Sequence, residues 1–566
     1  MLLVPALFAD SEEPQTAEGY LQQLFFDGPS PAGTLREYYE VASLGGLTAT
    51  GAVAPWYRTS VTLEAGTGGD TTVFGIGEEL GTYLLEAIAA ADQVMDLGEF
   101  DNDGPDGIPN SGDDSGYVDA LAFMFVEPKR SCGGPGVWPH KSWLSGWTNG
   151  PPYVSDDLRP DGTPVVADGY VIISASECDG TPLSTVSVMA HELGHELGLP
   201  DLYDPKGEGV ERILSVNRVW VLGCFDLMAA GSWGCGPADQ FPITGPPHLS
   251  AFLRDRLGWV NLTTVGSVRY REYVLQPVQT SHQALAVPLD AGGVETLLIE
   301  YRPATGFDDD LPASGVLVYR HNLAGSYRPR PPDTPPHRRI SMLEADGDST
   351  LWKTHFEGGN RGEAGDVFAA DGTVGVINNV THPSTRLVTG APTSVTIHSI
   401  SSDGLTARIV ISTAETPAVV AAGGLGTVTA LNEVSRDFPV GGGALPYTMT
   451  VAPNTKPDGI VLRADGDRLS VEGTVLQTGQ FDIDMLIEDA RGVVGSTSLP
   501  VVVLSPVIAD STLMTGLLGR ATSDMSVKQR SLLDNDGNRN GSYDVGDLRR
   551  YLLGPNRAVP RASAGR

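Results

Sequence analysis

The sequence is poor in basic residues, in cysteine and in long apolar runs. Its 566 residues include 37 lysines and arginines against 70 aspartates and glutamates, for a formal net charge of −33. An acidic protein repels phosphate groups, so the charge argues against nucleic acid or an anionic membrane as a partner. No apolar stretch approaches the roughly 18 residues that a transmembrane helix needs, so we expect no membrane span.

Only four cysteines are present, Cys132, Cys178, Cys224 and Cys235, and none has zinc-finger spacing. An even number of cysteines in an acidic, lysine-poor chain of several domains indicates two disulfides and an oxidising compartment. Four cysteines allow three pairings, of which we favour Cys224–Cys235 together with Cys132–Cys178.

The first ten residues do not resemble a signal peptide. They lack a basic segment, and Pro5 interrupts their short apolar run. We expect them to form a buried first strand. Because an oxidising compartment implies a secreted, extracellular protein, we expect its export signal and any pro-segment to lie outside this chain.

One stretch, His191-Glu192-Leu-Gly-His195-Glu-Leu-Gly198-Leu-Pro-Asp201, has the residues of a catalytic metal site. Two histidines four residues apart share one face of a helix and can bind one metal ion. The glutamate after the first histidine can reach a water on that metal. Gly198 permits a chain reversal that would return Asp201 as a third ligand.

Two imidazoles, one carboxylate and one open position form the ligand set of a catalytic zinc. The alternative interpretation of His191-Glu192-x-x-His195 is a solvated helix face. The extension through Gly198 to Asp201 is hard to reach by chance, so we favour the zinc site.

Another stretch, residues 99–119, is acidic and contains seven aspartates and glutamates among glycines. Their mutual repulsion in a compact loop would be relieved by a hard cation with oxygen ligands. The alternative is a solvated acidic loop. The candidate calcium ligands are Asp101, Asp103, Asp106, Asp113 and Asp119.

Near the C-terminus, residues 536–547 match an EF-hand loop, with oxygen side chains at positions 1, 3, 5, 9 and 12 and glycine at position 6. The predicted ligands are Asp536, Asn538, Asn540, Asp544 and Asp547. A single hand is half of the usual pair. Asp346, Asp348 and residues 363–366 are weaker candidates for another cation, which surface turns explain equally well.

Three runs of sequence, 191–204, 226–233 and 248–260, are similar to those of the immune inhibitor A family of secreted bacterial metallopeptidases. Residues 100–104, 117–120 and 306–318 also resemble that family, and the likeness extends over roughly residues 1–412. The resemblance implies a metzincin-like catalytic domain with one zinc and structural calcium. It places the zinc on His191, His195 and Asp201, the general base on Glu192 and the Met-turn on Met228. Some metzincins have a tyrosine two residues after that methionine, where this chain has Ala230.

The chain is too long for one hydrophobic core. Its mixed helix and strand patterns, followed by short strands with turns, predict a multidomain α/β plus β protein. We expect helices over 34–42, 77–97 and 185–197, and apolar strands over 118–126 and 170–176. The predicted parts are a metzincin-like zinc peptidase domain (1–261), a β-sandwich domain (262–413), a linker (414–424), an immunoglobulin-like or cadherin-like β-sandwich (425–505), a dockerin-like EF-hand segment (506–556) and a disordered tail (557–566).

We therefore expect a secreted zinc-dependent metalloendopeptidase that acts as a monomer on proteins or peptides. The C-terminal modules suggest contact with carbohydrate or a cell surface. One alternative is a non-catalytic extracellular adhesin, in which the β modules bind and the metal site is vestigial. The other is a zinc amidase or deacetylase that acts on a non-protein substrate.

Overall fold

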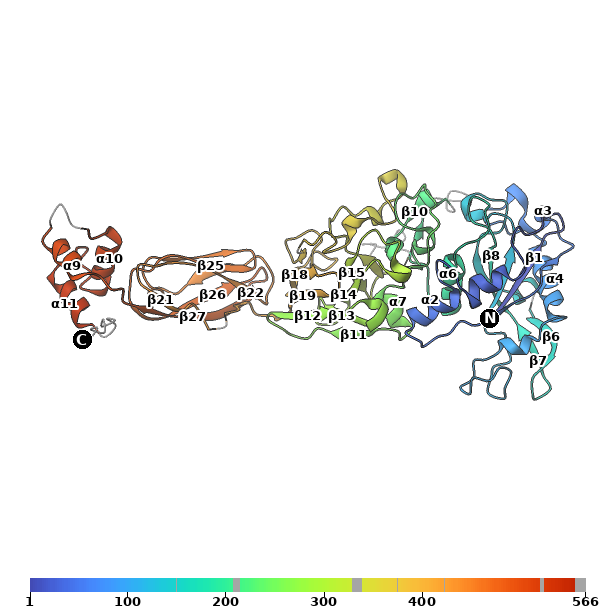
Figure 1. Ribbon diagram of the computed structural model, residues 1–566, viewed down its shortest axis with the longest axis horizontal. Coiled ribbons are helices and arrows are strands. Elements are labelled where there is room, and N and C mark those ends of the chain that lie inside the picture. Colours follow the sequence, from blue (N-terminus) through green and yellow to red (C-terminus); the bar gives the residue numbers. More distant parts are fainter. Residues whose placement is uncertain are drawn as a thin grey trace, which may run out of the picture. The chain divides into compact units, whose positions relative to one another are not determined.

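The computed structural model describes residues 1–148, 150–206, 214–327, 338–373, 375–421, 423–519 and 524–554 (Figure 1). The predicted disordered tail, 557–566, lies outside these residues. The chain divides into two compact units. The first comprises Met1–Thr264, Val274–Gly375 and Ser401–Arg408, and the second comprises Val265–Tyr273, Val376–Ile400 and Ile409–Arg566. Within the described residues, no helix is both long enough and apolar enough to cross a membrane.

The N-terminal part of the first unit is an α/β region built on one sheet. Its strand order is β2-β1-β4-β8-β5, and β3 also pairs with β1. Strands β1, β4 and β8 run parallel, and β5 is antiparallel to β8. The strands are β1 (Leu2–Leu7), β2 (Ala52–Val53), β3 (Tyr57–Arg58), β4 (Leu121–Phe125), β5 (His140–Trp143) and β8 (Gly169–Ser174).

Every residue of β1 and β4 is buried, which confirms the predicted first strand and is typical of parallel strands covered on both faces. Alternate residues of these strands enter two different cores. One core includes helices α2 (Leu35–Ala42) and α6 (Ser187–Glu196), and the other includes α4 (Leu80–Asp92). The sheet therefore lies between two helical layers, and the three predicted helices are present.

Several β-sheets follow this region. In the first unit a five-stranded sheet has the order β11-β13-β14-β15-β16. Another sheet has the order β12-β19-β18-β17, and most of its residues belong to the second unit. The strands are β11 (Asn261–Thr264), β13 (Gln283–Pro288), β14 (Glu295–Arg302), β15 (Gly315–Asn322), β16 (Ile340–Met342), β12 (Arg271–Leu275), β19 (Ala407–Ser412), β18 (Thr396–Ser402) and β17 (Gly375–Ile377).

In the second unit, two four-stranded sheets enclose one apolar core, with orders β20-β22-β25-β24 and β21-β27-β26-β23. Within the described residues after 505, three helices follow these sheets. The elements are β20 (Ala418–Val419), β21 (Gly426–Thr429), β22 (Glu433–Gly441), β23 (Thr448–Val451), β24 (Ile460–Asp465), β25 (Arg468–Thr474), β26 (Gly479–Glu488), β27 (Val494–Leu504), α9 (Asp510–Leu517), α10 (Val527–Asp536) and α11 (Val545–Leu553).

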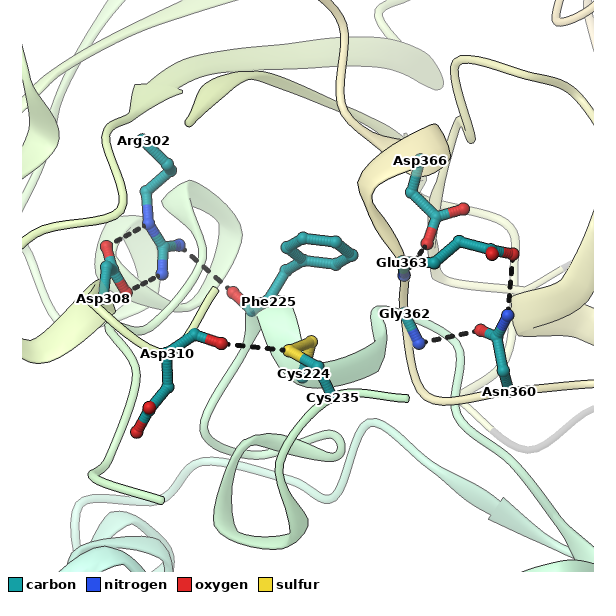
Figure 2. Close-up of a disulfide and its surroundings, with 10 residues drawn as sticks. All are labelled: Cys224, Phe225, Cys235, Arg302, Asp308, Asp310, Asn360, Gly362, Glu363 and Asp366. Carbon is teal, nitrogen blue, oxygen red and sulfur yellow. Dashed lines mark hydrogen bonds and ion pairs between the residues drawn. A yellow bond between two sulfur atoms is a disulfide. The ribbon is translucent and has the colours of Figure 1, made fainter. Parts of the chain in front are cut away.

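The structure forms both favoured disulfides, Cys132–Cys178 and Cys224–Cys235. Beside the second lies a buried network centred on Arg302 of β14 (Figure 2). Its guanidinium bonds both oxygens of Asp308, at 2.5 and 2.7 Å, and donates to the Phe225 carbonyl at 3.1 Å. Glu300 bridges Arg302 and Arg254, and all four charged side chains are at most 2% exposed. This network attaches the five-stranded sheet to residues 223–260.

We predict that Arg302→Met lowers the free energy of unfolding of the first unit by about 3–5 kcal/mol, because it leaves buried Asp308 without its cation. The control is Arg36→Met, which removes a half-exposed pair with Glu40 and should cost at most about 1 kcal/mol. Chemical denaturation of both variants measures the difference. Equal losses would contradict the structural role of Arg302.

Candidate active site

The predicted zinc motif lies on α6, and both of its imidazoles are oriented by backbone carbonyls. His191 Nδ1 is 2.9 Å from the Leu227 carbonyl oxygen, and His195 Nδ1 is 2.8 Å from that of Leu199. A carbonyl oxygen can only accept, so each Nδ1 carries a hydrogen, and in the neutral ring Nε2 holds the lone pair. The two rings are therefore held in the tautomer that binds a metal through Nε2.

Asp201 returns to the two histidines through the turn after α6. Gly198 has φ 80°, a left-handed conformation that glycine adopts without strain. Asp201 Oδ1 then lies 3.3 Å from His191 Nε2 and 3.4 Å from His195 Nε2. Ligand atoms bound tetrahedrally at about 2.1 Å from zinc lie about 3.4 Å from one another. The three side chains therefore fit a zinc ion and leave a fourth position open.

The charges of the site also suit a cation. Burial lowers the pKa of His191, but the carboxylates of Asp201 and Glu192 outweigh burial and raise that pKa to about 9. Burial raises the pKa of Asp201, yet the hydrogen bonds from both histidines hold it below its usual value. Glu192 is 5% exposed, and burial raises the pKa of its carboxyl group. With His191 also buried, the alternative of a solvated helix face does not hold.

Met228 lies beneath α6 in a tight turn. Its side chain is fully buried, and its sulfur is 2.6 Å from the position that a Cβ on Gly194 would occupy. Asp226, also fully buried, accepts hydrogen bonds from the Met228 and Ser250 amides, both at 2.7 Å. The Met228 carbonyl accepts from the Leu202 amide at 2.8 Å. This turn thus positions the Leu227 carbonyl below His191 and steadies the segment that carries Asp201.

Two neighbouring cavities form a cleft at His191 and Glu192. Two cavities, of about 360 and 720 Å³, share a set of lining residues, namely Trp138, Pro139, His191, Glu192, Tyr203 and Arg218. The smaller cavity extends to Trp233, Phe241 and Ile243. The larger extends to Phe74, Ile76 and Trp143. Glu192 therefore lies between two partly apolar hollows.

Sequence reasoning missed two basic residues of this cleft, Arg218 and Lys129. The Arg218 guanidinium is 1% exposed and lies 4.8 to 5.5 Å from the ring centres of four aromatic residues, Trp138, Tyr203, Trp220 and Trp233. Lys129 lines the smaller cavity, and burial lowers its pKa. Neither residue has a spacing relative to the zinc motif that would identify it. The only sequence signal was the frequency of tryptophan in this region.

The acidic loop of residues 99–119 brings together three of its five predicted ligands. One oxygen from each of Asp101, Asp103 and Asp119 lies within 4.8 Å of the others. Asp101 is fully buried, and its Oδ1 has no hydrogen-bond partner, which suits a cation ligand. Among the described residues, Asp106 and Asp113 do not join this group. Asp106 instead accepts the Ile108 amide, and Asp113 accepts the Ser111 hydroxyl.

The C-terminal loop brings together some of its predicted ligands. Asn538 and Asn540 donate to the Asp544 carboxylate at 2.8 to 3.2 Å, and Asp547 accepts the amides of Asn538 and Asp544 at 2.9 Å. Asp536 ends α10, and its carboxylate accepts the amide and hydroxyl of Thr478, both at 2.8 Å. Asp536, the first predicted EF-hand ligand, is therefore hydrogen-bonded to Thr478. It is not hydrogen-bonded to Asp544 or Asp547.

Two histidines, an aspartate and a buried glutamate in an open cleft are the residue types of a metallohydrolase centre. Residues 17–260 match the family model described as "Immune inhibitor A peptidase M6, catalytic domain". This segment is therefore a metallopeptidase catalytic domain of the M6 type, and the resemblance seen in the motifs is confirmed for it.

Two curated relatives agree with that match. The chain is 29% identical over 269 residues to Immune inhibitor A of Bacillus thuringiensis subsp. alesti, an alignment that covers 44% of this chain and 37% of that protein. It is 25% identical over 240 residues to the pre-pro-metalloprotease PrtV of Vibrio cholerae, covering 40% of this chain and 24% of that protein. The chain thus spans well under half the length of the curated relatives it matches.

We predict that Gly194→Ala destabilises the active site, because the added Cβ would lie 2.6 Å from the Met228 sulfur. Such overpacking costs about 1–3 kcal/mol. The control is Gly146→Ala, where a Cβ on exposed α5 (Ser145–Thr148) meets nothing within 4 Å. The Tm and the zinc content should both fall for Gly194→Ala, and neither should change for Gly146→Ala. Two variants of equal stability would contradict the close packing of Met228 on α6.

Proposed function

We propose that this protein is a secreted zinc-dependent metalloendopeptidase, with His191, His195 and Asp201 as zinc ligands and Glu192 as general base. The observation that carries the proposal is the position of Asp201 Oδ1, which lies 3.3 Å from His191 Nε2 and 3.4 Å from His195 Nε2, beside a buried glutamate. The two disulfides support an oxidising, extracellular location.

The chain's own residues account for substrate orientation and proton transfer. A zinc ion held by the three ligands would supply a Lewis acid for the scissile carbonyl and would lower the pKa of its bound water to about 7. Glu192 accepts the proton of the attacking water and then delivers it to the departing amine. The burial that raises the pKa of its carboxyl group makes Glu192 a stronger base toward that water.

The cleft favours cleavage within a chain over removal of terminal residues. Cavities extend from His191 and Glu192 in two directions, so residues on both sides of a scissile bond can be bound. Their aromatic and aliphatic linings suit apolar side chains. A zinc amidase acting on a small molecule needs only one hollow, so the endopeptidase is the better fit.

The remaining parts of the proposal concern the fold and structural ions. The parallel sheet with α6 beneath it supports a metzincin-like catalytic domain, and the two sheets around one core support an immunoglobulin-like module at 425–505. Asp101, Asp103 and Asp119 are proposed to hold calcium, as is the EF-hand-like loop. Calcium binding by the EF-hand-like loop would require the Asp536 carboxylate to give up its hydrogen bonds from Thr478 and bind the ion instead. We further propose a monomer whose C-terminal modules contact carbohydrate or a cell surface.

We predict that Glu192→Gln lowers kcat on a protein substrate such as casein by about 10²- to 10⁴-fold, because the amide cannot accept the proton. Zinc content should stay unchanged, since Glu192 is not a ligand. The matched control is Glu196→Gln, one turn along α6, whose carboxylate pairs with Lys141 at 2.8 Å. Full casein cleavage by Glu192→Gln would exclude Glu192 as the base.

We predict that a peptide-library digest by the zinc-loaded chain cuts at internal bonds. Elemental analysis should give about one zinc ion per chain at the catalytic site. A chelator should abolish cleavage, and added zinc should restore it. Absence of zinc, or zinc without any peptide cleavage, would overturn the proposed function and favour the adhesin or the amidase.

A further inference from the structure

A second group of carboxylates lies in the first unit, on residues outside the lining of the cleft. It comprises Glu344, Asp346, Asp348 and Asp366, and one oxygen from each lies within 4.8 Å of the others. Asp346 and Asp348 are exposed, whereas Glu344 is 4% exposed and Asp366 is fully buried. Like charges this close repel one another strongly where two of them are removed from water.

The fold holds these carboxylates together through two backbone hydrogen bonds. The amides of Ala345 and Asp346 donate to the carbonyls of Asp366 and Gly365, both at 3.1 Å. A Cβ on Gly365 would lie 2.2 Å from Asp346 Oδ2, so glycine leaves room for this carboxylate beside the second segment. The cluster is therefore built by the pairing of two chain segments and is not an accident of one acidic turn.

One buried oxygen of the cluster lacks a partner. Asp366 Oδ2 accepts the Glu363 amide at 2.8 Å (Figure 2), but Asp366 Oδ1 has no hydrogen bond. Among the described residues, no lysine, arginine or histidine forms an ion pair with any of the four carboxylates. Burial and the neighbouring acids raise the pKa of Asp366 to about 8 and that of Glu344 to about 7. The four carboxylates therefore lie together, and none of them is paired with a cationic side chain among the described residues.

We propose that Glu344, Asp346, Asp348 and Asp366 bind a structural calcium ion. The donors are all oxygen, which suits a hard cation and not zinc. Calcium accepts six to eight oxygens in irregular geometry, so four carboxylates with carbonyls or water can complete its shell. Binding neutralises the repulsion and satisfies Asp366 Oδ1.

This calcium braces the segment that leads into the Met228 turn. Glu344 accepts the Leu351 amide at 3.2 Å, and the Leu351 carbonyl accepts the Val221 amide at 3.2 Å. Near Asp366, the Arg361 carbonyl accepts the Cys224 amide at 2.6 Å. Residues next to both segments of the cluster therefore accept hydrogen bonds from residues 221–224, and calcium binding stabilises the floor of the active site.

The test compares calcium binding by the zinc-loaded full chain with that of the double variant Asp346→Asn and Asp348→Asn. Both positions are exposed, and asparagine retains the side-chain oxygens that accept the Asp348 and Thr350 amides. The matched control is Asp309→Asn and Asp371→Asn, which removes two exposed charges elsewhere in the first unit. The readouts are calcium per chain after equilibrium dialysis and the calcium-induced rise in Tm.

We expect the double variant to bind one calcium ion fewer than the wild type and the control, with a smaller rise in Tm. An equal calcium count in all three proteins, or none in the wild type, would overturn the proposal. If the double variant does not fold, Asp348→Asn alone should weaken one calcium site at least tenfold, and unchanged affinities would overturn the proposal. Peptidase activity does not enter these measurements, so their failure is distinguishable from failure of the proposed function.

Discussion

The hydrogen bonds from two imidazoles to the carbonyls of Leu227 and Leu199 are the constraint on which the site depends. They fix the tautomer and the direction of each ring, and so they determine where a metal can be bound. Leu227 belongs to the turn of Met228, and Leu199 to the reversal after α6. A shift of either loop by a fraction of an ångström would move a ligand atom out of place.

The loops themselves are held by buried charges that are paired. Asp226 accepts two amides at the Met228 turn, and Arg302 donates to the Phe225 carbonyl while it pairs with Asp308 and Glu300. A buried charge without its partner is costly, so such a network tolerates few other arrangements. The five-stranded sheet that carries Arg302 thereby acts as part of the catalytic unit.

Covalent links act on the same irregular segments. Cys224–Cys235 closes the Met228 turn, and Cys178 of the other disulfide lines the smaller cavity. These segments have little regular secondary structure, so few of their backbone groups are held by a helix or a sheet ladder. Disulfides and buried ion pairs are the means by which such loops can form a rigid cleft.

Local spacing in the sequence was sufficient to predict α6, the shared face of His191 and His195 and the apolar strands, because helix and strand periods act over a few residues. The sequence permitted the reversal at Gly198, and only the tertiary structure showed it and the parallel pairing of the strands. Only the tertiary structure decided that Asp101, Asp103 and Asp119 group together without Asp106 or Asp113, and that Asp536 bonds Thr478. It alone placed Arg218 in the cleft and set Asp366 beside Glu344. Those neighbours are brought together by strand pairing and loop packing between distant segments, which no local pattern of residues encodes.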